Sequence, residues 1–342
     1  MSATPKITFQ ELQQRLRNVD IPDGELAPYF IIHPDQAGPF NPVLMANPEL
    51  VTMTAEEFQS ESAMGIGNGL ARFRRQLRFK RAILLGEKRA TIVTEGDSWF
   101  QFPLLIDDVV DYLEEDYAVC CLSAAGDTAQ NMVFGTEGHG KREFLSALRQ
   151  QKDRVRAFVF SGAGNDIIGE DENGVPVLTS ILKNFQPGKS AADHVNFAVL
   201  GDKLAFLKGA YQRVFQTVHS EPGLETLPIV IHGYDHAIPW NSNVEGDPRN
   251  PTWAKKDEWL GGPMKERNIM EPAMQRAIIA LLIDALYDML GKLAASHANV
   301  HLVDARGALP DVTHWADEIH GTSDGFREVA ARFKDVLRSV IQ

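Results

Sequence analysis

Residues 95–99 put a serine hydroxyl where it could act as a nucleophile. The run ATIVTEG (90–96) ends at Gly96, and Asp97 and Ser98 follow it directly. The length and the β-branched content of this run predict a strand. A serine at the turn between a strand and a helix can expose its hydroxyl beside backbone N–H groups. The same three residue types are also common in turns for backbone reasons, so a purely structural turn is the competing interpretation.

A second segment could supply the base for such a serine. Asp317 and His320 stand three residues apart, between the run NVHLVDA (299–305) and a final amphipathic stretch. A carboxylate at this spacing on a turn can hold the imidazole in one tautomer, which leaves the other ring nitrogen to take the serine proton. An exposed turn or a helix start would place the same two residue types together without any catalytic role.

Two glycine-containing segments could stabilise negative charge. Gly126 follows the run YAVCCLS (117–123), and Asn165 follows the run RAFVFSG (156–162). A backbone N–H at Gly126 and the side-chain amide of Asn165 are neutral donors suited to a developing oxyanion. A plain turn explains either segment alone. However, all four segments follow different predicted strands, so they would project toward one edge of one sheet.

As an ordered set, these segments resemble the SGNH, or GDSL, hydrolase family of serine esterases and lipases over about residues 90–342. The resemblance implies a flavodoxin-like fold and hydrolysis of a carboxylic ester through an acyl-enzyme, with no cofactor and no metal. It further implies catalytic roles for Ser98, Asp317 and His320, and an oxyanion hole made by Ser98, Gly126 and Asn165. Gly321 follows the histidine where the family usually has proline, a change that would loosen the loop holding the base.

The segment HGYDH (232–236) and the nearby Trp240 contain further side chains that could bind a metal or line a pocket. Two histidines four residues apart suit a metal site on a helix better than one at a strand end with glycine. Two other interpretations of this segment are stronger than a metal site: its residues line a pocket, or they form a structural turn. We expect the substrate pocket to draw on Trp99, Asp166, Tyr234, Asp235, His236 and Trp240.

The elements that must position these residues follow from hydrophobic patterning. One further run, LPIVIHG (227–233), completes a set of five apolar stretches of strand length, and amphipathic stretches lie between them. This alternation predicts a three-layer α/β/α sandwich around a five-stranded parallel sheet. Long segments at about 167–190 and 234–267 interrupt the rhythm, and we expect these insertions to shape the ligand crevice.

Residues 1–89 differ from the rest, and the family resemblance does not account for them. Thr8 and Glu11 form a capping-box pattern that predicts a helix start, and irregular Pro- and Gly-rich sequence follows. We therefore expect a mainly helical extension of unknown role beside a hydrolase domain at 90–342. The basic run ARFRRQLRFKR (71–81) predicts a solvated helix face or a docking surface for a protein partner. An acidic series from Asp107 to Asp116 predicts a solvated helix face.

Composition limits the function classes. The 342 residues carry a net charge of −12, which argues against binding nucleic acid or an anionic membrane through bulk charge. No secretory leader or membrane-spanning stretch is expected, and the adjacent Cys120 and Cys121 do not suggest a disulfide framework, so we expect a cytoplasmic protein. The leading hypothesis is hydrolysis of a small-molecule or lipid ester. An O-acetyl carbohydrate deacetylase and a non-catalytic binding or signalling module are the alternatives.

Overall fold

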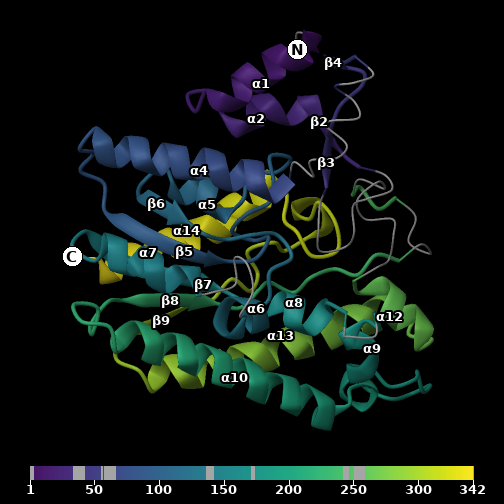
Figure 1. Cartoon of the computed structure of the whole chain (residues 1–342). Coiled ribbons are helices and arrows are strands. Elements are labelled where there is room, and N and C mark those ends of the chain that lie inside the picture. The colour runs from purple at the N-terminus through teal and green to yellow at the C-terminus, as the bar shows by residue number, and fades with distance from the viewer. Residues whose placement is uncertain are drawn as a thin grey trace.

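A five-stranded parallel sheet forms the centre of the chain (Figure 1). The computed structural model describes residues 4–33, 43–54, 57, 67–135, 142–170, 174–241, 246–249 and 259–341. The strand order is β6-β5-β7-β8-β9, which is the doubly wound order with a switch point between β5 and β7. The strands are β5 (Thr91–Gly96), β6 (Ala118–Cys121), β7 (Val155–Ser161), β8 (Ile229–His232) and β9 (Val300–Val303). Each coincides with one of the five predicted runs.

Helices cover both faces of the sheet, as predicted. All residues of β5 and β8 are buried, which is why both strands read as nearly continuous apolar runs. One face carries α5 (Val109–Leu113) and α14 (Ser323–Val340), with α4 (Gly67–Leu84) against β6 (Figure 1). The other face carries α6 (Ala129–Phe134), α7 (Glu143–Gln151), α10 (Phe197–His219) and α13 (Pro272–Ala295).

Short elements gather beyond the carboxyl ends of the strands. They are α8 (Gly164–Ile168), α9 (Val177–Ile181), the 3-10 turns η3 (Ala191–His194) and η4 (Val312–His314), and α12 (Gly261–Glu266). Two of them, α9 and α12, lie within the two expected insertions. A separate hydrophobic cluster joins α9 and α12 to the first turns of α13. Residues 171–173, 242–245 and 250–258 of these insertions fall outside the described residues.

The region before residue 90 contains small sheets as well as helices, so the expected mainly helical extension describes only part of it. Its elements before α4 are β1 (Ile7–Thr8), α1 (Phe9–Arg17), α2 (Asp23–Leu26), η1 (Ala27–Tyr29), β2 (Phe30–Ile32), β3 (Leu44–Ala46) and β4 (Val51–Thr52). β1 pairs in parallel with β4, and β2 pairs antiparallel with β3. The predicted capping box is present, since Thr8 N donates to Glu11 and Glu11 N donates to Thr8 Oγ1.

Two arginines of the basic run are buried rather than solvated, which corrects the expectation for this segment. Arg74 and Arg75 are 0% and 2% exposed. Arg74 bonds Asp23 at 2.7 Å and donates to the carbonyl of Leu16 at 2.5 Å, because the last carbonyls of α1 lack intrahelical donors. Arg75 bonds Asp108 at 2.7 Å and the carbonyl of Phe100 at 2.6 Å. Arg75 therefore links α4 to the chain that follows β5.

Part of the acidic series is also paired rather than solvated. Asp108 is buried and Asp111 lies 2.9 Å from Arg75. Glu114 bonds Arg78 at 2.7 Å. The basic and acidic runs, which the sequence presented as two separate solvated surfaces, thus neutralise each other between α4 and α5.

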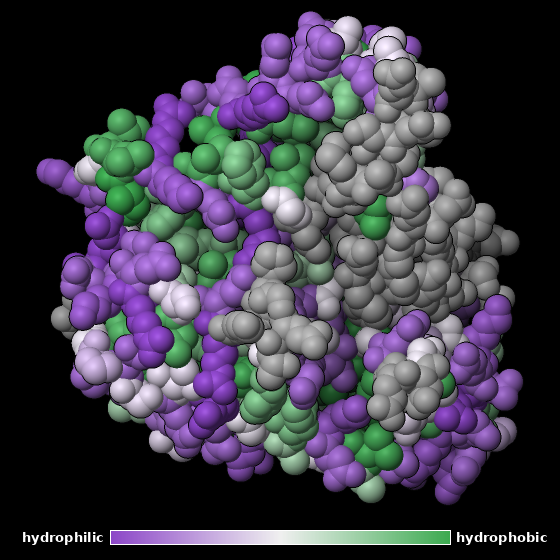
Figure 2. Space-filling model, viewed as in Figure 1, coloured by the Kyte–Doolittle hydropathy of each residue, from purple (hydrophilic) through white to green (hydrophobic). Residues whose placement is uncertain are grey.

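The docking surface expected in the basic run stays a prediction. Apolar side chains are exposed on α4 and directly after it. Phe73 and Leu84 are 47% and 86% exposed, and Leu85 follows at 67%. Figure 2 shows a green cluster at the left end of α4. Among the described residues, the structure has no helix that is both long and apolar enough to cross a membrane.

Candidate active site

Ser98 lies in a tight turn at the carboxyl end of β5. The carbonyl of Asp97 accepts from the N–H groups of Phe100 and Gln101 at 3.0 Å, and the Asp97 side chain accepts from Trp99 N at 3.1 Å. Gly96 lies so close to the neighbouring strand that a Cβ there would be 2.7 Å from Ser161 Cβ. Only glycine fits this position, so the Gly-Asp-Ser order has a steric cause as well as a turn-forming one.

A continuous hydrogen-bonded chain joins the serine, the histidine and the aspartate. His320 Nε2 lies 2.7 Å from Ser98 Oγ, and His320 Nδ1 lies 2.7 Å from Asp317 Oδ2. Ser98 is 6% exposed, His320 4% and Asp317 3%. The structure therefore brings together residues 222 positions apart in an arrangement that allows proton transfer from hydroxyl to imidazole.

The loop that carries His320 is fixed by its own backbone. Asp317 Oδ1 accepts from the N–H groups of Ile319 and His320 at 2.8 and 2.7 Å. His320 O accepts from Ala316 N at 2.8 Å. A Cβ at Gly321 would lie 2.9 Å from Leu309 Cδ2, so glycine allows close packing there.

Glu318 ties this loop to the second insertion, and the sequence analysis did not identify it. Its carboxylate accepts backbone N–H groups from Trp240 at 2.6 Å, Gly261 at 2.7 Å, Leu260 at 3.0 Å and Trp259 at 3.2 Å. Burial raises the pKa of Glu318 to about 7, against the effect of these four donors. Its position beside Asp317 was the available signal, but the amides that it binds are 57 to 78 residues away along the chain.

The two expected oxyanion donors from other strands lie in different surroundings. Asn165 lies in the first turn of α8 and lines the same cavity as Ser98, and its Nδ2 donates to the carbonyl of Asp127 at 2.7 Å. An amide nitrogen carries a second hydrogen, which can donate to a ligand in that cavity. Gly126, with φ of 84°, lines a neighbouring and more polar hollow together with Asp127 and Asn131.

A buried polar network supports the turn of Ser98 from behind. The Tyr234 hydroxyl donates to Asp97 and accepts from Gly164 N at 2.9 Å. Ser161 Oγ donates to Asp97 at 3.2 Å, and His232 Nε2 lies 2.7 Å from Ser161 Oγ. Burial lowers the pKa of His232 to about 3, so the ring is neutral, and burial raises the pKa of Asp97 to about 6.

Sequence analysis missed this network, although its members stand at strand ends. The sequence presents Asp97 as a turn residue and His232 as a weak candidate for a metal ligand, and it indicates no role for Ser161. The useful signal was that each polar side chain ends an otherwise apolar strand. Such a buried group needs a hydrogen-bond partner, and neighbouring strands end close together.

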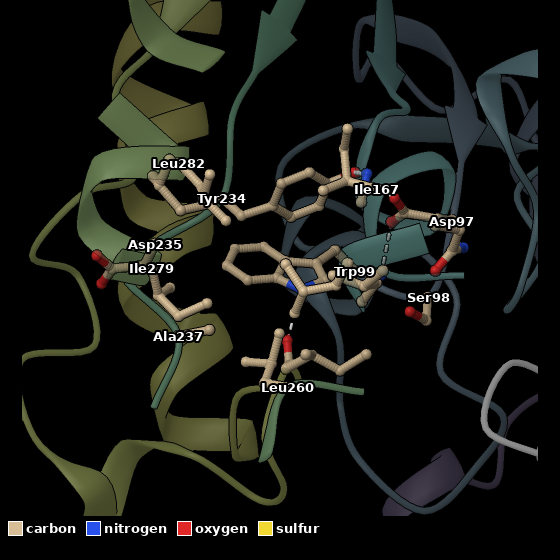
Figure 3. A pocket seen from close by; sticks show the side chains of 16 residues that line it. Asp97, Ser98, Trp99, Ile167, Tyr234, Asp235, Ala237, Leu260, Ile279 and Leu282 are labelled. Carbon is tan, nitrogen blue, oxygen red and sulfur yellow. Dashed lines mark hydrogen bonds between the residues drawn. The ribbon is translucent and has the colours of Figure 1, made fainter. Parts of the chain in front are cut away.

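An apolar cavity opens beside Ser98 (Figure 3). Its volume is about 80 Å³. Trp99, Tyr234 and Asp235 line it, as expected. Aliphatic side chains from both insertions, from α13 and from the loop of His320 form much of its wall, among them Ile167, Leu178, Leu260, Ile279, Leu282 and Ile319.

No family model and no curated protein matches the sequence. Its structure matches those of SGNH-type esterases at low sequence identity. A provisionally assigned arylesterase from Agrobacterium tumefaciens has 14% identity and a TM-score of 0.42, over 74% of this chain and 100% of that chain. The carbohydrate acetylesterase Est24 from Sinorhizobium meliloti has 12% identity and a TM-score of 0.40, over 74% and 100%.

Three of the expected pocket residues lie outside the lining of this cavity. Asp166 instead accepts from Ala129 N at 2.7 Å at the start of α6, and burial raises its pKa to about 6. His236 Nε2 contacts Asp284 at 3.1 Å. The Trp240 ring packs 5.3 Å from the guanidinium of Arg249. The sequence located these residues near the correct edge of the sheet, but loop conformation decides where each side chain points.

The other expected features of the segment after β8 also have structural partners. The Asp235 carboxylate lines the cavity, yet it accepts from the N–H groups of Gly307 and Leu309 at 2.6 Å. His232 and His236 contact Ser161 and Asp284 respectively, so the two histidines do not converge on one point. The segment functions as a structural turn with Tyr234 and Asp235 at the cavity.

Proposed function

We propose that this protein is a serine-dependent carboxylic ester hydrolase of the SGNH type. The observation that supports it most directly is the chain of two 2.7 Å contacts from Ser98 through His320 to Asp317. A serine hydroxyl is a weak nucleophile unless a base can take its proton, and a buried imidazole fixed by a carboxylate is such a base. The position of Ser98 beside the β5–β7 switch point agrees with where doubly wound sheets bind ligands.

In the first step, Ser98 Oγ attacks the ester carbonyl carbon while its proton passes to His320 Nε2. Asp317 accepts from His320 Nδ1–H and stabilises the imidazolium that forms. The tetrahedral intermediate carries its negative charge on the former carbonyl oxygen. It collapses when the C–O bond to the alcohol breaks and His320 donates its proton to that alcohol, which leaves the acyl group on Ser98.

In the second step, water attacks the acyl-enzyme and gives its proton to His320. The acid leaves and the proton returns to Ser98, so the enzyme is regenerated. The oxyanion of both steps would be stabilised by the N–H of Ser98 and the side chain of Asn165. Gly126 is the third candidate donor, through its backbone N–H.

Replacing Asn165 with alanine should lower kcat by about 10²–10³-fold, because one oxyanion donor is lost. Steady-state kinetics with a p-nitrophenyl ester measures this effect. Asn131→Ala is a matched control, since the Asn131 amide also bonds Asp127, at 2.7 Å, but lies outside the cavity of Ser98. The control should stay within about twofold of the native rate. Equal effects of the two substitutions would contradict the oxyanion role of Asn165.

A fluorophosphonate probe tests the proposed function itself. An activated serine attacks phosphorus and expels fluoride, so the native protein should gain one adduct, located at Ser98 by peptide mass spectrometry. Heat-denatured protein, in which the imidazole no longer contacts the hydroxyl, should not react. Absence of labelling and of ester hydrolysis in the native protein would reject the enzyme and favour the non-catalytic module.

A further inference from the structure

The cavity beside Ser98 extends from the proposed nucleophile to α13. Ser98 and Asn165 line one part of it, and Ile279, Leu282 and Ile283 of α13 line another. In the view of Figure 3, the indole of Trp99 lies between Ser98 and the labelled α13 side chains. An acyl group attached to Ser98 could therefore extend along Trp99 toward this helix.

Polar groups along the cavity are already paired within the protein. Trp99 Nε1 donates to the carbonyl of Ile319 at 2.9 Å. The Tyr234 hydroxyl is engaged by Asp97 and Gly164, and the Asp235 carboxylate accepts from three backbone N–H groups. A polar ligand would lose its bonds to water here without gaining equivalent partners. An apolar occupant avoids this cost and gains from burial.

The volume of the cavity indicates the size of that occupant. The cavity volume of about 80 Å³ is several times the ~10–15 Å³ that one water-sized sphere needs. An acetyl group would leave most of this space unfilled. A chain of several methylene groups would occupy it and displace water from apolar walls.

We infer that this cavity binds the acyl chain of the ester and that the preferred substrates carry an aliphatic acyl group of several carbons rather than acetyl. The inference rests on the proposed ester hydrolysis and adds its substrate class. Ile279 and Leu282 then set the chain length from the far wall. The O-acetyl carbohydrate alternative is disfavoured, because its acyl group would use little of the cavity.

A series of p-nitrophenyl esters tests the inference with a constant leaving group. For the native protein, kcat/KM should rise by about fourfold per added methylene from acetate to butyrate, since each buried methylene adds binding in the transition state. It should then fall for chains too long for the cavity, such as dodecanoate. Acetate as the best substrate would overturn the inference while leaving ester hydrolysis intact. No hydrolysis of any ester and no fluorophosphonate labelling would instead reject the proposed function.

A pair of substitutions on α13 locates the specificity. Leu282→Phe fills the cavity and should lower kcat/KM for the hexanoate ester by about tenfold or more, while the acetate ester changes by less than about twofold. Ala277→Phe adds the same ring at an exposed position of the helix and should alter neither. An equal loss for all esters in Leu282→Phe, with unchanged thermal stability, would contradict the assignment.

If Leu282→Phe does not fold, a variant that enlarges the cavity, Ile279→Ala, tests the same assignment. Ile279→Ala enlarges the cavity and should move the preferred chain length upward by one or more methylene groups. An unchanged profile in a folded Ile279→Ala protein would exclude α13 as the far wall of the acyl site.

Discussion

Replacing Ser98 with alanine should reduce ester hydrolysis by roughly 10⁴–10⁶-fold in kcat, the range found when a triad member is removed. Without Oγ no acyl-enzyme forms, and His320 can only assist direct attack by water. Thermal unfolding should change little, because the substitution removes one oxygen and leaves the turn bonds of Asp97 in place. The measurement is the steady-state rate on p-nitrophenyl butyrate, together with the melting curve of each protein.

Ser123→Ala is the matched control for this experiment. Ser123 is also a buried serine just past a strand end at the same edge of the sheet, but it does not line the cavity of Ser98. Its replacement should leave kcat within about twofold of the native value. Comparable activity of Ser98→Ala and the native protein would remove the serine mechanism altogether.

Replacing Arg75 with methionine should lower the free energy of unfolding by about 3–5 kcal/mol, as expected when one partner of a buried ion pair is lost. Asp108 would remain 0% exposed without its cation, although Phe102 N and Val110 N still donate to it at 2.7 and 2.9 Å. The carbonyl of Phe100 would also lose its donor. Urea unfolding followed by circular dichroism measures the change.

Arg81→Met provides the comparison, because Arg81 and its partner Asp20 are 49% and 66% exposed. An exposed pair of this kind contributes only about 0–1 kcal/mol. Equal destabilisation by the two substitutions would show that Arg75 has no special role. A deficit confined to Arg75→Met would show that α4, from the region before residue 90, supports the chain that leads out of the Ser98 turn.

The sheet and the central residues of the site could be predicted from sequence because both depend on local order. Apolar runs of strand length identify β5 to β9, and parallel strands place their carboxyl ends at one edge. Ser98 and Asn165 closely follow such runs, so their approach at one edge required no knowledge of loop conformation. His320 lies further beyond its run and reaches Ser98 through the loop that Asp317 holds. The shared lining of one cavity by Ser98 and Asn165 follows from the same topology.

The features that sequence did not predict depend on contacts between distant segments. Charge alone did not reveal that Arg75 pairs with Asp108, since a basic helix face and an acidic one look solvated when each is considered separately. His236 lies beside an expected pocket residue, yet it turns toward Asp284 on α13. Glu318 could not be recognised beside Asp317, because its partners belong to a loop whose path the sequence does not specify.

The bonds of Glu318 have a consequence for anyone who would redesign this protein. One carboxylate holds both the loop of the base and the backbone of Leu260, which forms part of the cavity wall. A change at Leu260 that reshapes the cavity would therefore also disturb the alignment of His320, so selectivity and turnover would change together. Ile279 and Leu282 belong to a long helix outside this linkage. Engineering for new acyl groups should begin on that helix, where selectivity can be altered with the least cost in rate.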